Sequence, residues 1–197
     1  AIYYTNYTSE DIDKKAVELK YYDSVEIPDG FYYVGGKKET GLVISDVQGD
    51  DLENSKKGNQ FVWVPVEKES DYTRNNKINS SSITATTGYL PDDMVQEDNA
   101  ENNATVEKQA VIDAHGYYIS RFEVGNENGN VVTKKGATII TNTVSVNTVK
   151  TNVKKFINND SVKSSLCSEI QWDLASNYIK TNSSGNNYRF ILYVKPR

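Results

Sequence analysis

Residues 60–66 read Gln60-Phe61-Val62-Trp63-Val64-Pro65-Val66, the most apolar run of the sequence. An uninterrupted run of β-branched and aromatic residues of this length is typical of a buried strand in the centre of a sheet. Two shorter runs precede it, Phe31-Tyr32-Tyr33-Val34 and Gly41-Leu42-Val43-Ile44-Ser45. Gly35-Gly36 ends the first run, and a polar loop from Asp46 to Asn59 follows the second. The three runs together predict a meander of strands.

A further aromatic strand is predicted in Gly116-Tyr117-Tyr118-Ile119-Ser120-Arg121-Phe122-Glu123-Val124. Side chains of a strand alternate between its two faces, so Arg121 and Glu123 share one face with Tyr117 and Ile119. Asn126 to Asn130 has the composition of a hairpin turn, after which Val131-Val132 resumes the strand pattern. The last predicted strand is Tyr188 to Val194.

Four segments have helical spacing of their apolar residues. The first, Ser9 to Tyr22, begins with Ser9 as a cap and carries Ile12, Ala16 and Leu19 on one face. Ser168 and Gln171 form a capping box at the start of another. Because helices are interspersed with mostly antiparallel strands, the fold class expected is α+β: a small twisted antiparallel sheet flanked by helices, with an N-terminal helix. The four predicted helices are Ser9 to Tyr22, Val106 to Ala114 with Gly116 as its C-terminal cap, Val144 to Asn158, and Ser168 to Ile179.

The organisation expected is an N-terminal helical extension in residues 1–24 and one domain in residues 25–197. Within the domain, Glu67 to Thr105 is polar, rich in Asn and Ser and without periodicity, which predicts a long surface loop. Tyr72, Tyr89 and Met94 are apolar anchors within this loop and are candidate binding residues. Disorder of the segment is the competing interpretation.

Charge and composition exclude several classes of partner. The chain of 197 residues has a formal net charge of −5, and its Lys and Arg residues are scattered, so no basic stripe is present to bind nucleic acid or an anionic membrane. No apolar run is long enough to span a bilayer. A polar composition dominated by Asn, Ser, Thr and Tyr, and a first residue other than Met, favour an extracellular or cell-surface location.

Four motifs, in this order, resemble the formylglycine-generating (sulfatase-modifying-factor) branch of the C-type-lectin-like fold. They are Phe61-Val62-Trp63-Val64-Pro65-Val66, Gly116 to Val124, Leu166-Cys167-Ser168-Glu169-Ile170-Gln171-Trp172-Asp173, and Tyr188-Arg189-Phe190. The similarity spans roughly residues 25 to 197 and implies a C-type-lectin-like domain. Within these motifs, the candidate residues for a structural network are Arg121, Glu123, Trp63, Trp172 and Arg189. The competing interpretation is that the tryptophans are ordinary core aromatics and that Arg121 and Glu123 are a solvated charge pair.

Departures from that family argue against its chemistry. Formylglycine-generating enzymes use a pair of cysteines, whereas Cys167 is the single cysteine of this sequence. The segment that normally carries much of the family's binding face is reduced to Lys180 to Asn187. The EPN, QPD and WND motifs of calcium-dependent sugar-binding lectins are absent. The resemblance therefore implies a degenerate, non-catalytic domain, with no cofactor expected.

Other candidate sites have simpler explanations. His115, the single histidine, lies at a helix end, where it complements the helix dipole. Cys167 precedes a helix N-terminus and is expected to be a buried, inert thiol. An acidic loop offers carboxylates that suit a hard cation such as calcium, although it lacks EF-hand spacing and a solvated loop is the simpler alternative. Its acidic residues are Asp46, Asp50, Asp51 and Glu53.

Two function classes remain. The first is a non-enzymatic extracellular surface protein, either an adhesion protein or a pilin-like appendage subunit that assembles with itself; an apolar helix upstream of Ala1 would favour it. The second is a ligand-recognition module, such as a phage receptor-binding or variable lectin-like protein, which would bind a protein or glycan ligand on a cell surface. A residual formylglycine-generating-type enzyme is the weaker alternative.

Overall fold

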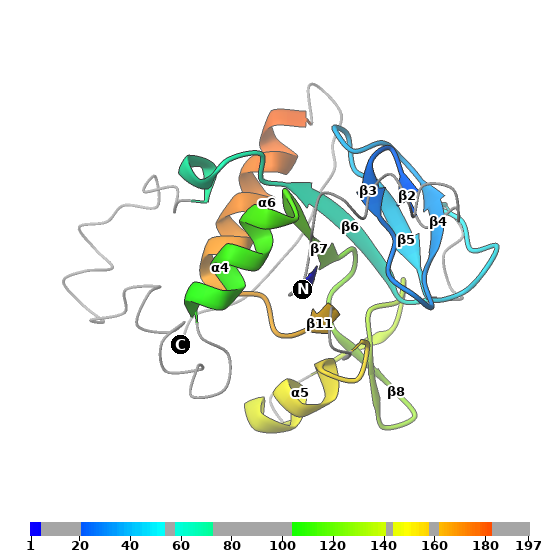
Figure 1. Ribbon diagram of the computed structural model, residues 1–197. Helices are drawn as coiled ribbons and strands as arrows, with labels where there is room; N and C mark the ends of the chain where they lie inside the picture. The colour runs from blue at the N-terminus through cyan, green and yellow to red at the C-terminus, as the bar shows by residue number, and fades with distance from the viewer. Residues whose placement is uncertain (5–20, 54–57, 73–103, 141–143, 158–161, 183–197) are drawn as a thin grey trace.

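The computed structural model describes residues 1–4, 21–53, 58–72, 104–140, 144–157 and 162–182 (Figure 1). These residues form a mixed α+β fold in which every strand pair is antiparallel, as the sequence predicts. A six-stranded sheet has the order β11-β1-β7-β6-β5-β4. Its strands are β11 (Val162–Ser164), β1 (Ile2–Tyr4), β7 (Gly116–Ser120), β6 (Gln60–Pro65), β5 (Val43–Ser45) and β4 (Tyr32–Gly35).

Smaller elements surround this sheet. A three-stranded sheet has the order β10-β8-β9 and a two-stranded sheet pairs β2 with β3. Among the described residues the helices are η1, a short 3-10 helix, and the α-helices α4, α5 and α6. The bounds of these elements are β2 (Tyr21–Tyr22), β3 (Val25–Glu26), β8 (Gly125–Glu127), β9 (Asn130–Val132), β10 (Thr138–Ile139), η1 (Glu69–Asp71), α4 (Ala104–Asp113), α5 (Val146–Val153) and α6 (Glu169–Asn182).

The β6 and β7 pair forms the middle of the six-stranded sheet, with Trp63 opposite Tyr118 and Val64 opposite Tyr117. Both faces of this pair are buried, because Tyr117 and Tyr118 point to opposite faces and each is 0% exposed. The predicted meander of β4, β5 and β6 is confirmed. The strand predicted over Gly116 to Val124 is confirmed only as far as Ser120, where β7 ends, so Arg121 to Val124 are not part of it. Two separate layers of the protein pack on the sheet, one on each face of β6 and β7.

One face of the sheet is covered by the β2-β3 hairpin. Its Val25, together with Ile27 and Phe31, packs in the same core cluster as Trp63 and Tyr118. The hydroxyl of Tyr118 donates a hydrogen bond of 2.8 Å to the carbonyl of Glu26, which ties the hairpin to the sheet.

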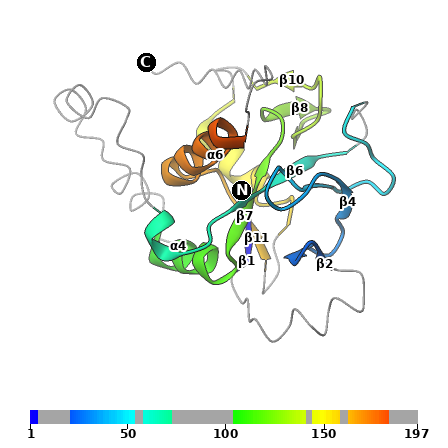
Figure 2. The ribbon, with the colours of Figure 1, turned by 90° about the horizontal axis from the view of Figure 1, so that it is seen from above.

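The opposite face is covered by α4 and α6, and Figure 2 shows these two helices on the side of β6 and β7 away from β2. Ala110 and Val111 of α4 and Ala175 of α6 pack against Val64 and Tyr117 in a second core cluster. The hydroxyl of Tyr117 also donates a hydrogen bond to the carbonyl of Gln171, so strand β7 and helix α6 are joined by polar as well as apolar contacts.

The predicted capping box is confirmed at the start of α6. The backbone N–H of Gln171 donates to Ser168 Oγ over 3.3 Å, and the backbone N–H of Ser168 donates to Gln171 Oε1 over 3.0 Å. The predicted α5 helix is also present, but it ends at Val153 rather than at Asn158. The hydroxyl of Ser164 in β11 donates to the Val153 carbonyl over 2.7 Å and accepts from the Ile157 N–H over 3.1 Å, so it replaces bonds that a longer helix would make.

The N-terminal region differs from the prediction. Tyr21 and Tyr22, expected at the end of a helix, form β2, because Asp23 and Ser24 adopt positive φ angles of 54° and 62° and turn the chain into a two-residue hairpin. Residues 9–20 of the predicted helix lie outside the described residues. Ile2–Tyr4 form β1, a strand that no sequence pattern predicts, and β1 is inserted between β7 and β11.

The end of α4 is also corrected. Gly116 was expected to cap the helix, but His115 takes the left-handed conformation with φ of 58° and Gly116 begins β7. Glycine is required there for another reason: a Cβ at this position would lie 2.4 Å from Trp63 Cζ2 and 2.5 Å from the Val64 carbonyl oxygen. The predicted strand Tyr188 to Val194 lies outside the described residues.

Candidate functional site

A buried polar network lies where the acidic loop meets β6. The side chain of Gln60, the first residue of β6, is 0% exposed. Its Nε2 donates to Asp50 Oδ2 and to the Asp51 carbonyl, each over 2.9 Å, and its Oε1 accepts from Arg121 Nη1 over 2.5 Å. Ser45 Oγ donates to the same Asp50 oxygen over 2.8 Å. Gln60 thereby connects the acidic loop to the end of β7.

The pKa of Asp50 follows from this environment. Burial alone would raise the pKa, but the hydrogen bonds from Gln60 and Ser45, with those from the backbone of Asp51 and Gly58, hold it below its ordinary value. Asp50 is therefore a carboxylate used to hold the loop, rather than a solvated charge.

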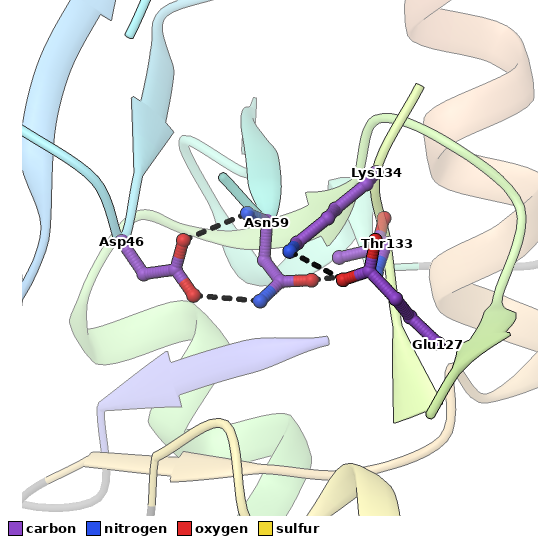
Figure 3. Close-up of polar contacts among 5 residues, drawn as sticks. All are labelled: Asp46, Asn59, Glu127, Thr133 and Lys134. Atoms are coloured by element: carbon purple, nitrogen blue, oxygen red, sulfur yellow. Dashed lines mark hydrogen bonds and ion pairs between the residues drawn. The ribbon is translucent and has the colours of Figure 1, made fainter. Parts of the chain in front are cut away.

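A second set of polar contacts links the two larger sheets (Figure 3). Asn59 donates from its backbone N–H to Asp46 Oδ1 over 2.7 Å and from Nδ2 to Asp46 Oδ2 over 2.6 Å. Its own Oδ1 accepts from the backbone N–H of Thr133, just beyond β9, over 2.7 Å. Lys134 and Glu127 form an ion pair of 2.7 Å on the same small sheet. Asn59 thus fixes the position of the three-stranded sheet relative to β6.

The residues proposed for a structural network occupy different environments. Arg121 bonds Gln60 and lies 5.2 Å from the ring centroid of Phe122, whereas Glu123 is partly exposed in the segment between β7 and β8. Trp63 is 2% exposed and packs edge-on against Tyr118, with ring centroids 5.0 Å apart. Trp172 is only partly buried on α6. Arg189 lies outside the described residues.

The predicted binding loop gives a mixed result. Tyr72 is 9% exposed and packs in the second core cluster with Val66 and Val111, so its side chain faces the protein interior instead of a partner. Tyr89 and Met94 belong to the stretch 73–103, which lies outside the described residues. Thr105, expected at the end of the loop, is already part of α4.

Among residues 1–4, 21–53, 58–72, 104–140, 144–157 and 162–182, no group of three or more His, Cys, Asp or Glu side chains is placed to hold a metal ion. His115 is exposed, and Cys167 is partly buried with its Sγ 3.3 Å from the Ser168 carbonyl. None of the helices in this part of the chain has both the length and the apolar character needed to cross a membrane.

Three exposed tyrosines form a surface that the sequence analysis did not single out. Tyr22 of β2 is 40% exposed, and Tyr32 and Tyr33 of β4 are 41% and 36% exposed. The rings of Tyr22 and Tyr33 stack, with centroids 3.6 Å apart and planes inclined by 17°. We call these three residues the tyrosine edge, because β4 is the last strand in the order of the six-stranded sheet.

The position of β4 explains why these rings are exposed. Tyr32 pairs with Ser45 and Tyr33 with Ile44 across β5, so the two tyrosines point to opposite faces of the sheet. Ser45 and Ile44 are 0% exposed, while the tyrosines beside them lie at the rim. The sequence contains two pairs of adjacent tyrosines nearby, Tyr21-Tyr22 and Tyr32-Tyr33, and this is a weak signal for an aromatic site. Their position at the edge of the sheet depends on tertiary structure.

The hydroxyl of Tyr33 donates to the Gly36 carbonyl over 2.8 Å, and the Asp23 carboxylate accepts from the backbone N–H of Lys38 over 2.8 Å. Partial burial, a hydrogen bond with Tyr22 and electrostatic interactions with Tyr22 and the Asp23 carboxylate raise the pKa of Tyr33 to about 12. Tyr33 therefore stays a neutral phenol at a higher pH than an ordinary tyrosine does, and it lies near the Asp23 carboxylate.

Comparison of the chain with protein-family models, with curated proteins and with solved structures gives no match. The function is therefore inferred from the residues themselves.

Proposed function

We propose that this chain is a non-enzymatic binding domain of an extracellular surface protein, in which the tyrosine edge is the contact surface. The exposed tyrosine edge is the observation that carries the proposal. Tyrosine offers a large apolar face and a polar hydroxyl at a small cost in side-chain entropy, and it is enriched in protein interfaces. The Tyr22–Tyr33 stack fixes these two rings in place, and more than a third of each residue still remains exposed for contact with a partner.

The polar network supports this role by making the surface rigid. β4 is connected through β5 to β6, and β6 is held to the acidic loop and to the small sheet by Gln60 and Asn59. A pre-organised surface loses less conformational entropy on binding than a mobile one. Adhesion and assembly into an appendage both require such a surface.

The C-type-lectin-like fold of the formylglycine-generating type is part of this proposal. It is supported by the order of the four motifs and by the antiparallel pairing of two of them, β6 and β7, in the middle of one sheet. An experimentally determined structure that pairs Tyr188 to Val194 within the six-stranded sheet would agree with this assignment, and one that places those residues in a helix would contradict it.

The binding function is tested with a protein array and a glycan array of extracellular ligands. The probes are the wild-type chain and a variant with Tyr22→Ser, Tyr32→Ser and Tyr33→Ser together, which removes the rings and keeps a hydroxyl. We expect saturable binding to at least one arrayed ligand, lost in the triple variant. The control variant is Ile139→Ser, which removes an exposed apolar side chain, 54% exposed, from β10. Equal binding by the wild type and the triple variant would contradict the proposal.

The location is tested separately by surface biotinylation of intact cells that express the full-length protein. Labelling of the protein on intact cells, with a cytoplasmic marker left unlabelled, is the expected result. Labelling only after lysis would contradict an extracellular location.

A further inference from the structure

We propose that β4 accepts an extended, basic segment of a partner protein as an added antiparallel or parallel strand, clamped between Tyr32 on one face and the Tyr22–Tyr33 stack on the other. This inference rests on the proposed binding function and names the class of partner. It follows from three properties of the tyrosine edge: its place in the sheet, the sides on which its rings lie, and the charge around them.

The first property is the place of β4 in the sheet. Within the described residues, β4 is hydrogen-bonded to β5 on one side and has no strand on the other. An edge strand presents backbone N–H and C=O groups that an extended peptide can pair with. β4 spans four residues and its register shifts between Tyr33 and Gly35, so the added strand would be short.

The second property is that the tyrosines lie on both faces of β4. Tyr32 shares its face with Ser45, and Tyr33 shares the other with Ile44. A strand added beside β4 would alternate its own side chains between these two faces, and successive side chains would contact Tyr32 and then Tyr33. A sugar ring or a helix lying on the sheet would contact one face only. The geometry therefore favours an extended peptide.

The third property is charge. Acidic residues outnumber basic ones within residues 21–40, which contain Asp23, Glu26, Asp29 and Glu39 against Lys37 and Lys38. Lys38 is paired with Glu67 at 2.9 Å, and Asp23 is close enough to Tyr33 to raise the pKa of its hydroxyl. The face of a tyrosine ring also attracts ammonium and guanidinium groups. Lys or Arg side chains of the partner strand would therefore lie over the outer face of the Tyr22–Tyr33 stack.

The experiment uses a phage-displayed library of random twelve-residue peptides, selected on the wild-type chain and counter-selected on a Tyr22→Ser, Tyr33→Ser variant. A recovered peptide is then synthesised and its affinity is measured by fluorescence anisotropy. We expect recovered peptides to have basic residues at alternate positions and to lose about tenfold or more in affinity for Tyr33→Ser, as truncation of a central aromatic residue usually causes. Affinity for Ile139→Ser should be unchanged.

Hydrogen exchange locates the binding. When the peptide is added, the backbone amides of residues 32–35 should become protected from exchange. The amides of β11, at the opposite edge of the six-stranded sheet, should not change. Three results would overturn the inference: peptides that leave residues 32–35 unprotected, amides there that are already fully protected without peptide, and dimerisation of the chain that Tyr33→Ser abolishes. Binding on the glycan array alone would also overturn it while leaving the proposed binding function intact.

Discussion

Asn59 and Asp46 are joined by two hydrogen bonds, one from the backbone and one from the side chain of Asn59, so that both carboxylate oxygens of Asp46 are used. The side-chain oxygen of Asn59 accepts a hydrogen bond from the backbone N–H of Thr133. A loop, a central strand and a second sheet therefore meet at one asparagine. Gln60, the next residue, makes a similar connection between the acidic loop and Arg121.

Replacing Gln60 with Leu should lower the free energy of unfolding by about 3 kcal/mol, because Asp50 and Arg121 would each lose a buried hydrogen-bond partner. Urea denaturation followed by circular dichroism measures this change. Gln109→Leu is the matched control, since Gln109 bonds Asp113 on the exposed surface of α4 and its loss should cost less than about 0.5 kcal/mol. Equal effects of the two substitutions would show that the Gln60 network does not contribute to stability.

Asp50 should make folding stability depend on pH in the acid range. Its pKa is lowered in the folded state from the ordinary 3.8, so its contribution is fully present above about pH 4 to 5 and is lost as the pH falls through the folded-state pKa. Asp50→Asn should therefore flatten the decline in unfolding free energy below pH 4, measured by urea titrations at several pH values. Asp113→Asn, at the exposed end of α4, is the control. A decline in Asp50→Asn as steep as in the wild type would contradict the expectation.

Gly116→Ala should destabilise the protein by about 3 kcal/mol or more, because the added Cβ would overlap Trp63 and the Val64 carbonyl. Gly129→Ala provides the comparison: Gly129 also has a positive φ, of 82°, but a Cβ there meets nothing within 4 Å. Its cost should be about 1 kcal/mol, from backbone strain alone. Thermal unfolding of the two variants separates the cost of steric overlap from the cost of backbone strain. A similar loss of stability in both variants would show that Trp63 moves aside readily.

Trp63→Ala should cost about 3 to 5 kcal/mol, as expected for a large aromatic residue that is 2% exposed. Trp172→Ala should cost clearly less, because Trp172 is only partly buried, and α6 packs on the sheet through Ala175 with Ile170, Leu174 and Tyr178. Denaturant titration of both variants tests this order. A larger loss for Trp172→Ala would show that Trp172, rather than Ala175 and its neighbours, is the main contact of α6 with the sheet.

Local patterns predicted those elements whose partners are close in sequence or whose signal is strong. The apolar run at Gln60 to Val66 and the capping box of Ser168 and Gln171 correspond to observed elements. The hairpin turn predicted over Asn126 to Asn130 is also present, but it is confined to Asn128 and Gly129 between β8 and β9. Their causes are local: continuous hydrophobicity, complementary caps and residues that accept positive φ.

The features that were missed depend on distant partners. Ile2–Tyr4 is too short to carry a pattern of its own and is a strand only because β7 and β11 lie on either side of it. Tyr72 is surrounded by polar sequence, yet it is buried because Val66 and α4 bring apolar surface to it. The exposure of the tyrosine edge depends on the strand order, because Tyr32 and Tyr33 would be covered if another strand lay beside β4. Local sequence does not determine that order.

The insertion of β1 between β7 and β11 has a consequence for how the chain folds. Ile2 pairs with Tyr118 and with Ser164, so its partners on the two sides come from segments that a ribosome makes much later. Closing such long loops is entropically costly, and sheets built from distant segments form slowly. The β4, β5 and β6 meander should therefore be able to form first, and the six-stranded sheet can be completed only after residues 162–164 have been synthesised.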